Sequence, residues 1–525
     1  MKQTYKKPCI YDIKRACIIL LITFFCPAFY FWDNGLGVEE ITTILATAVV
    51  TAISLYYITG FAPPKARKII LAILFVLSIP GNIIVWSNLY VSHQWMKVSS
   101  FWVIFSTNPT EAGEYIKQFT DIINITVSVL YTITGTVLIA AMKSTVRTTF
   151  RPLMNKILFL PAFAAIVMTM ILNYIVIAVP TFGFYHSFAR FAVYNNKMKQ
   201  MLNLKDNMQD VPCSLQSNIP HTFVIVIGES TSKYHQSIYG YQRNTTPYQD
   251  TLKNNGELLI YTNIVTPHMN TRDALEKVLS FANCEKPKEM LTKPNIIDIV
   301  NAAILSGGKR FTSYWINNQE LKSIFQSPVC FVCSKNAGNL IDIKSANDGP
   351  VLEAFRNTLS DTAENKIIFL HLAGNHFKYS NRYTSEFDKF DYREDGLIDR
   401  DFRTNNMKKT IDQYDNSILF GDYILHSVIE AVRSINHSSF VLFFSDHGED
   451  VYEDGNFLGH HSEFYPTRYQ SEVPFVIWRS KEYISEIPEL NIDTARPYNN
   501  EDFIHSLGIL MRLKYPAFDS TLSIF

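Results

Sequence analysis

The chain has 525 residues, of which 48 are basic and 48 acidic. This balance gives no argument for a nucleic-acid partner, because such a partner usually requires an excess of positive charge. The aromatic fraction is 14%, which is high for a soluble protein. Long apolar runs occur in residues 1–180, whereas residues 181–525 have a mixed composition typical of globular domains.

Five apolar runs in the first region are long enough to cross a bilayer. They cover residues 16–33, 41–61, 69–91, 122–142 and 157–180. The first run resembles a signal peptide, but it lacks a clear small-residue cleavage site and four more runs follow it. The alternative is that the chain has fewer membrane spans and that one of these runs is buried within the protein. We expect a transmembrane domain of five helices over residues 1–180.

Lysine and arginine are concentrated on one side of these predicted spans. The N-terminal segment and the loops at 62–68 and 143–156 together carry 12 basic residues, whereas the loops at 34–40 and 92–120 carry 2. Loops rich in Lys and Arg stay in the cytoplasm. The N-terminus is therefore predicted to be cytoplasmic, and five crossings place everything after residue 180 on the outer face.

Residues 181–215 are predicted to form a linker that contains an amphipathic helix. Aromatic side chains recur near helical spacing over 184–202, with basic residues between them, so this helix is expected either in the membrane interface or packed on the following domain. The outer region has an even number of cysteines, Cys213, Cys284, Cys330 and Cys333. For the C-F-V-C pair we expect a local disulfide, with a metal or redox site as the alternative.

Residues 216–525 show the pattern of an α/β domain with a largely parallel sheet. The segments 222–230, 366–376 and 438–449 are almost continuously apolar and then turn abruptly polar, as buried parallel strands do. Helical patterns lie between them, for example over 273–281 and 405–432. Ligands bind such sheets at the carboxyl ends of the strands.

Each of these three predicted strands ends in residues of the types that bind metals. The candidates are Glu229 after the first, His376 after the second, and Asp446 and His447 after the third. The mixture of carboxylates and imidazoles is typical of zinc, with manganese also compatible. Two adjacent histidines, His460 and His461, follow in a glycine-containing loop, and His460 is the preferred further ligand. Individually, each of these residues could instead be an ordinary polar side chain.

Thr271 lies where a predicted strand leads into a predicted helix. Asn270 and Thr271 are both favoured helix N-caps, which gives Thr271 a purely structural interpretation, and the segment taken alone favours it. A hydroxyl at a helix N-terminus beside a zinc ion is also suited to nucleophilic attack on phosphorus. The segment by itself leaves both interpretations open.

Several segments in this order resemble the bacterial phosphoethanolamine transferases of the alkaline-phosphatase/sulfatase superfamily. They are VIVIGES-TSKYHQSIYGYQRNTTP (224–247), TPHMNTRDALEKVLSFAN (266–283), SYWINNQ (313–319), HLAGNHFKY (371–379), YDNSIL (414–419) and SDHGEDVY (445–452). The resemblance implies an inner-membrane enzyme with a periplasmic catalytic domain over 216–525. It also implies that Thr271 is the nucleophile, that zinc is bound by Glu229, Thr271, Asp446 and His447, and that His376 and His460 bind substrate phosphate or a second zinc ion.

The same resemblance implies the reaction. Phosphatidylethanolamine would donate phosphoethanolamine to Thr271, and lipopolysaccharide would accept it from the threonine. Three segments are more similar to relatives that modify the lipopolysaccharide core than to those that modify lipid A; they are GESTS, IYGYQRNTTP and GNHFKY. The loop FSTNPTEAGEY (105–115) is similar to a family loop that binds the lipid donor, which would make Thr107 and Glu111 donor-binding residues, unless they only cap an interfacial helix.

Three other functions are considered. A phosphoglycerol transferase of the same superfamily shares the spans and the threonine. A sulfatase requires a cysteine or serine that is converted to formylglycine, which Thr271 cannot supply. A non-catalytic membrane sensor on this fold would be expected to have lost ligands, whereas every expected ligand type is present here.

Overall fold

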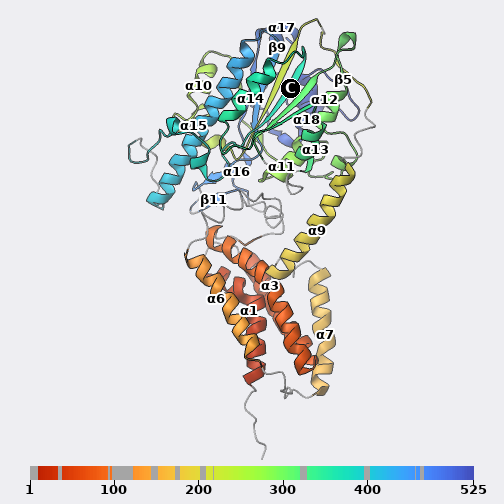
Figure 1. Cartoon of the computed structure of the whole chain (residues 1–525), viewed down its shortest axis with the longest axis vertical. Coiled ribbons are helices and arrows are strands. Elements are labelled where there is room, and N and C mark those ends of the chain that lie inside the picture. Colours follow the sequence, from red (N-terminus) through yellow and green to blue (C-terminus); the bar gives the residue numbers. More distant parts are fainter. Residues whose placement is uncertain are drawn as a thin grey trace, which may run out of the picture. The chain divides into compact units, whose positions relative to one another are not determined.

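The computed structural model describes residues 10–32, 38–92, 95–96, 122–142, 152–171, 178–201, 209–216, 218–319, 328–394, 402–453, 455, 457–460 and 466–525. These residues group into two compact units, Met1–Tyr194 and Asn195–Phe525 (Figure 1). Each unit is described by itself.

The first unit is helical. Its helices are α1 (Ile10–Trp32), α2 (Val38–Phe61), α3 (Pro64–Ser92), α6 (Ile122–Ala140), α7 (Pro152–Ile171) and most of α9 (Pro180–Met201). Within the described residues, three stretches are long and apolar enough to cross a membrane, namely Thr42–Phe61, Pro64–Tyr90 and Ile122–Ala140. They coincide with the second, third and fourth predicted spans. The count of five stays a prediction, since α7 ends at Ile171 and so covers only part of the fifth predicted span.

Buried polar side chains join three of these helices. The amide of Asn82 on α3 donates to the carbonyl of Ile22 on α1 at 3.2 Å and to the hydroxyl of Tyr131 on α6 at 3.0 Å. The same Tyr131 hydroxyl lies 2.8 Å from the Ser78 hydroxyl. In an apolar environment such hydrogen bonds have no competing water, so they help to fix which helices pack together.

The second unit is built on a seven-stranded sheet with the order β3-β12-β9-β2-β8-β6-β7. The neighbours β9-β2-β8-β6-β7 are parallel, whereas β12 is antiparallel to both β9 and β3. The largely parallel sheet is therefore confirmed. The strands are β2 (His221–Gly228), β3 (Leu258–Tyr261), β6 (Thr312–Asn317), β7 (Asn339–Asp342), β8 (Lys366–His371), β9 (Ser438–Ser445) and β12 (Phe475–Arg479).

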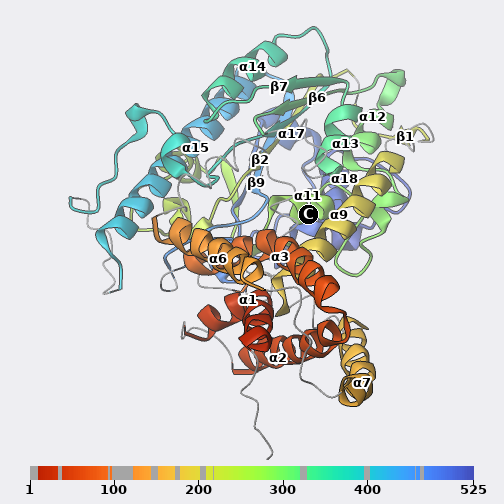
Figure 2. The same ribbon diagram turned by 60° about the horizontal axis from the view of Figure 1, so that its bottom comes forward.

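Helices cover both faces of this sheet, with α10, α14 and α15 on one side and α12, α13 and α18 on the other (Figures 1 and 2). Alternate side chains of the central strands point toward opposite faces of the sheet. Val224 of β2 belongs to a core that includes Phe355 of α14 and Val428 of α15. Its neighbour Phe223 stacks on Phe440 with ring centroids 4.5 Å apart, next to Tyr483 of α17. Burial on both faces explains why these strands are continuously apolar.

The remaining elements of this unit are short, apart from α15. The helices are α10 (Pro247–Asn254), α11 (Thr271–Val278), α12 (Ile296–Ala302), α13 (Pro328–Asn336), α14 (Gly349–Leu359), α15 (Asn405–Arg433), α16 (Arg468–Ser471), α17 (Lys481–Glu486) and α18 (Phe503–Leu510). The short strands are β1 (Val211–Pro212), β4 (Ile264–Val265), β5 (Ala303–Ile304), β10 (Asp450–Val451), β11 (Leu458–Gly459) and β13 (Tyr498–Asn499).

No disulfide joins Cys330 and Cys333, which corrects the predicted local disulfide. Both lie on α13, three residues apart and buried. A regular helix does not give two such side chains the short Cβ separation and the dihedral angle that a disulfide needs. No disulfide joins Cys213 and Cys284 either.

Candidate active site

The register of the sheet places the polar ends of its three central strands at one edge. Gly228 pairs with Ser445, and Ile227 pairs with His371, so β2, β9 and β8 end at the same level. Glu229 follows β2 directly and is 1% exposed. The backbone of Gly374 packs so tightly against it that a Cβ there would lie 2.7 Å from the Glu229 nitrogen, and Gly374 has a φ of +52°. Glycine at this position therefore allows the β8 loop to close on Glu229.

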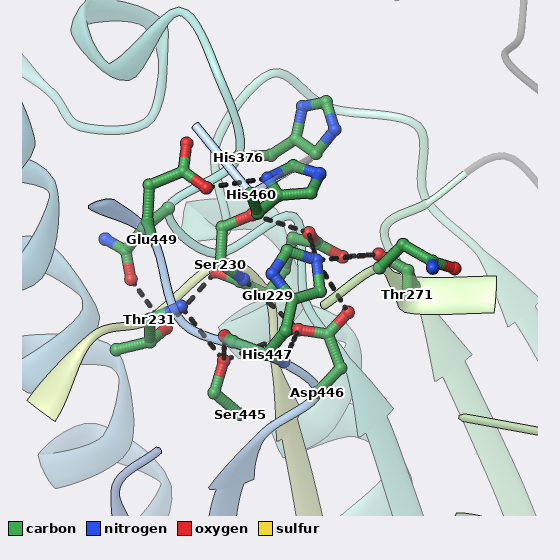
Figure 3. A network of polar contacts seen from close by, with 12 residues as sticks. Glu229, Ser230, Thr231, Thr271, His376, Ser445, Asp446, His447, Glu449 and His460 are labelled. Atoms are coloured by element: carbon green, nitrogen blue, oxygen red, sulfur yellow. Dashed lines mark hydrogen bonds and ion pairs between the residues drawn. The ribbon is translucent and has the colours of Figure 1, made fainter. Parts of the chain in front are cut away.

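Thr271 is the first residue of α11 and does not cap it. The cap is Asn270, whose side-chain oxygen accepts a hydrogen bond from the Asp273 backbone nitrogen at 2.9 Å. The Thr271 hydroxyl instead donates to Oε2 of Glu229 at 2.8 Å and lies 3.3 Å from Nε2 of His447 (Figure 3). The structural interpretation of Thr271 as an N-cap is therefore wrong, because the neighbouring asparagine fulfils that role.

Asp446 and His447 follow β9 and complete the cluster. Nε2 of His447 lies 3.3 Å from Oε1 of Glu229 and 3.5 Å from Oδ2 of Asp446. Nδ1 of His447 is 2.8 Å from the Gly448 carbonyl, to which it donates, so Nε2 is directed at the carboxylates. Oδ1 of Asp446 accepts from the backbone nitrogens of Ser230 and His447, at 3.2 and 2.7 Å.

The electrostatics of this cluster favour a cation. Burial and the nearby charge of Glu229 raise the pKa of Asp446 to about 8. Burial would raise the pKa of Glu229 as well, but the hydrogen bond and charge of His447 hold it well below its usual range. Burial would lower the pKa of His447, yet the charge of Asp446 and the hydrogen bond to Glu229 raise it to about 10. Two carboxylates thus share a dry site in which positive charge is stabilising.

The donor set fits zinc. Glu229, Asp446 and His447 each offer a ligand atom, and these atoms all lie within 4.8 Å of one another. Oδ2 of Asp446 is buried and has no hydrogen-bond partner among the residues that the structure describes, which is costly for a carboxylate oxygen unless a cation binds it. Two carboxylates and one imidazole, with the Thr271 hydroxyl at the open position, match the ligand types of a zinc site that keeps one position for chemistry.

A second group of possible ligands borders the first. It consists of His447, Glu449 and His460. Nδ1 of His460 lies 2.6 Å from Oε2 of Glu449, and its ring centroid is 4.2 Å from that of His447. Figure 3 shows His376 beside His460, on the side of the cluster away from Asp446. Nδ1 of His376 is buried and has no hydrogen-bond partner among the described residues. The predicted histidines therefore line one side of the cluster.

Two further residues of the site were missed by the sequence-based prediction. Gln319 donates from its side-chain nitrogen to Oε2 of Glu229 at 2.8 Å and to the Leu372 carbonyl at 3.0 Å. Glu449 accepts from the Tyr379 hydroxyl at 2.6 Å while it holds His460. Glu449 follows the buried strand β9, so the rule that identified Asp446 would have selected it as well, whereas Gln319 is not a metal-binding residue type and that rule would not have selected it. Thr107, Glu111 and His461 lie outside the described residues.

A buried ionic network joins the loop after Glu229 to α15. His235 is held between two carboxylates, with Nδ1 2.6 Å from Oδ1 of Asp415 and Nε2 2.8 Å from Oε1 of Glu453. Arg243 pairs with Asp415 and Asp412, each at 2.7 Å. Burial would lower the pKa of His235, but the charges of Glu453 and Asp415 raise it to about 10. Removing one member of such a network leaves a buried charge without compensation.

We expect His235→Asn to lower stability by ~3–5 kcal/mol near pH 6 and by less at higher pH. Free histidine has a pKa of about 6.5. Because the folded-state pKa is raised to about 10, the stabilisation is complete below the unfolded value and is lost as the pH rises through the folded value. Thermal melting of wild type and His235→Asn should show a smaller difference in Tm between the two proteins at pH 9.5 than at pH 6.

His437 provides the matched control, since burial lowers its pKa. For His437→Asn the difference in Tm from wild type should not shrink between the same two pH values. A difference for His235→Asn that is independent of pH would contradict a charged imidazole at this position.

Comparison with known proteins places the chain in a family. Residues 221–513 match the sulfatase family. The phosphoethanolamine transferase EptC of Escherichia coli K12 is 28% identical over 94% of this chain and 90% of its own length. CptA of Salmonella typhimurium is 29% identical over 90% of this chain and 85% of its own length. The Kdo(2)-lipid A phosphoethanolamine 7''-transferase of E. coli is 27% identical, but over only 51% of this chain.

Solved structures agree with these sequence matches. The C-terminal periplasmic domain of E. coli EptC, crystallised in complex with zinc, is 32% identical and covers 59% of this chain and 89% of that domain, with a TM-score of 0.54. The integral membrane transferase EptA of Neisseria meningitidis matches 98% of both chains with a TM-score of 0.70 at 18% identity, which shows a shared fold. The chain therefore belongs to the sulfatase family, in which it is a homologue of the phosphoethanolamine transferases EptC and CptA.

Proposed function

We propose that this enzyme transfers phosphoethanolamine from phosphatidylethanolamine to lipopolysaccharide through a covalent phosphoethanolamine-threonine intermediate on Thr271. The observation that carries the proposal is the position of the Thr271 hydroxyl, which donates to Glu229 at 2.8 Å and lies 3.3 Å from Nε2 of His447. A hydroxyl on the first turn of a helix, among residues that suit zinc, is placed for attack on a phosphate ester.

In the first half-reaction, the Thr271 oxygen forms a bond to the donor phosphorus, and the bond from phosphorus to the diacylglycerol oxygen breaks. Diacylglycerol leaves with the proton that Thr271 gave up. A zinc ion held by Glu229, Asp446 and His447 would act as a Lewis acid and would lower the pKa of the threonine hydroxyl. The helix dipole of α11 favours negative charge at the same oxygen.

In the second half-reaction, an acceptor hydroxyl oxygen forms a bond to the phosphorus and the bond from phosphorus to the Thr271 oxygen breaks. The Thr271 oxygen takes up the proton that the acceptor hydroxyl gave up. His376 and His460, the imidazoles beside the cluster, are proposed to contact the phosphate oxygens. Nδ1 of His460 already donates to Oε2 of Glu449 at 2.6 Å, so His460 would make this contact through its Nε2. A second zinc ion at His447, Glu449 and His460 is the alternative role for His460. Gln319, through its hydrogen bond of 2.8 Å to Glu229, holds that carboxylate in orientation.

Lipopolysaccharide core is the acceptor we propose, in preference to lipid A. The support is the extent of the matches, which cover 94% and 90% of this chain for EptC and CptA but 51% for the lipid A transferase. The donor is a two-tailed lipid, which stays in the bilayer because each buried methylene contributes about 0.8 kcal/mol. A membrane anchor therefore keeps the catalytic domain near its donor.

We further propose the location and arrangement of the chain. The protein lies in the bacterial inner membrane, with five spans over 1–180, an interfacial helix and linker over 181–215, and a periplasmic catalytic domain over 216–525. The cytoplasmic N-terminus rests on the 12-to-2 excess of basic residues in the loops on one side. Thr107 and Glu111 are proposed to contact the lipid donor.

Mass spectrometry of lipopolysaccharide tests this function. Cells that carry the gene should show lipopolysaccharide heavier by one phosphoethanolamine, and fragmentation should place the increment on a core sugar or its phosphate. Cells that carry the Thr271→Ala form at the same protein level are the matched control and should lack the increment. An increment on lipid A would show that lipid A, and not the core, is the acceptor. The absence of an increment in every fraction would contradict the proposed function.

A further inference from the structure

A group of basic and aromatic side chains, of which Arg468 is exposed and Tyr469 is buried, borders the site on the side of β12 and β3. It consists of Lys233, Tyr234, Arg468 and Tyr469, and we refer to it as the Arg468 patch. The guanidinium carbon of Arg468 lies 5.0 Å from the ring centroids of both Tyr234 and Tyr469. The two rings meet edge to face with centroids 5.0 Å apart. One guanidinium nitrogen donates to the Tyr469 hydroxyl at 3.0 Å.

The segments that carry this patch adjoin those that carry the candidate zinc ligands. Lys233 and Tyr234 follow Glu229 within five residues. Arg468 and Tyr469 lie on α16, which packs against the residue after His447. The Gly448 nitrogen donates to the Gln470 carbonyl at 2.8 Å, and a Cβ on Gly448 would lie only 2.2 Å from the Tyr469 carbonyl oxygen.

The far end of the patch is anchored at the same edge of the sheet. Nζ of Lys233 donates at 2.9 Å to the carbonyl of Thr262, which follows β3. Tyr261 of β3 pairs with Phe475 of β12, and Phe475 pairs with Phe444 of β9. β3 therefore ends level with β9, two strands away, which is a displacement of about 10 Å. The patch thus extends from the cluster across this edge.

The chemistry of the patch suits a phosphate group. Glu472 pairs with Lys233 and accepts from the Tyr234 hydroxyl at 2.7 Å, so the charges of Lys233, Arg468 and Glu472 sum to +1. Arg468 is exposed. A guanidinium stacked on aromatic rings is pre-organised for bidentate binding of phosphate, because its orientation is fixed before the ligand arrives.

We propose that the Arg468 patch binds a phosphate group of the lipopolysaccharide acceptor and so directs the acceptor oxygen toward Thr271. This inference rests on the proposed function. Phosphatidylethanolamine has a single phosphate, and that phosphate must lie at Thr271 in order to react. A second anion-binding surface bordering the same cluster is therefore assigned to the acceptor.

The test compares two acceptors and two half-reactions in the full-length enzyme. Purified lipopolysaccharide is used as isolated and after chemical removal of its core phosphates. Arg468→Gln should raise KM for the phosphorylated acceptor about tenfold, in line with the loss of a charge-assisted hydrogen bond, and should leave kcat nearly unchanged. With the dephosphorylated acceptor, wild type and variant should have the same KM. Arg310→Gln, which removes another exposed arginine, one paired with Asp210, is the control and should behave as wild type.

Formation of the Thr271 adduct from phosphatidylethanolamine alone separates this inference from the proposed function. The rate should be equal in wild type and Arg468→Gln. An Arg468→Gln protein with the same KM as wild type for both acceptors, or with equally raised KM for both, would overturn the acceptor site while leaving the function intact. A wild type that forms no adduct would overturn the proposed function and this inference together.

Discussion

Replacing Thr271 by alanine is expected to reduce phosphoethanolamine transfer by about three orders of magnitude or more. Alanine removes the oxygen that would bond to phosphorus, and among the described residues no other hydroxyl forms hydrogen bonds with the side chains of both Glu229 and His447. Stability should change little, because the Thr271 hydroxyl does not cap α11. Transfer from a fluorescent phosphatidylethanolamine, measured on protein with an unchanged melting curve, gives the result.

Asn270→Ala is the matched control, because it removes the cap of α11 beside an intact nucleophile. It should cost about 1 kcal/mol of stability and leave most of the activity. Thr271→Ser should keep part of the activity, since serine retains the hydroxyl but lacks the methyl group that restricts its rotamer. A folded Thr271→Ala protein with near-normal turnover would remove Thr271 from the mechanism.

Asp446→Asn is expected to lose zinc and to reduce transfer at least a hundredfold. The substitution removes one of the two carboxylates of the Glu229, Asp446 and His447 cluster, including the buried Oδ2 that has no hydrogen-bond partner within the described part of the chain. Burial and the charge of Glu229 already raise the pKa of Asp446 to about 8. In chelator, therefore, Asp446→Asn should be no less stable than wild type, because it relieves this repulsion. Zinc content and melting curves with and without chelator measure both effects.

Asp422 offers a buried carboxylate of the same domain as a control. It accepts from the backbone nitrogens of Tyr248 and Gln249, at 2.8 and 3.1 Å, at the start of α10. Asp422→Asn should keep its zinc, in contrast to Asp446→Asn, because Asp422 contacts the start of α10 and is not a member of the cluster. A full equivalent of zinc in purified Asp446→Asn would show that Asp446 is not a ligand.

The local pattern of the chain was sufficient to predict the sheet and the residues at its edge. Runs such as SSFVLFFS are buried on both faces, and their parallel pairing brings Glu229 and Asp446 together although 217 positions separate them. Parallel strands end at a common edge, so the polar residue after each strand had to lie there. The position of His376 after β8 follows from the same rule, whereas His460 follows β11, which lies outside the parallel sheet. The roles of both histidines stay predictions.

What the sequence could not determine depends on contacts between distant segments. Asn270 and Thr271 are equally good caps by composition, and only the approach of α11 to Glu229 shows which one faces the cluster. Gln319 carries no metal-binding signature, and its role depends on β6 ending close to Glu229. The thiols of Cys330 and Cys333 match a disulfide by spacing, but the helical backbone of α13 separates them.

The central claim is that Thr271 carries phosphoethanolamine during the reaction, and mass spectrometry of the protein tests it most directly. The wild type is incubated with phosphatidylethanolamine in the absence of acceptor, quenched in acid and digested. The peptide containing Thr271 should gain the mass of one phosphoethanolamine, and lipopolysaccharide added before the quench should remove it. Active enzyme that releases diacylglycerol while its Thr271 peptide stays unmodified, or that carries the group on another residue, would show that Thr271 is not the nucleophile.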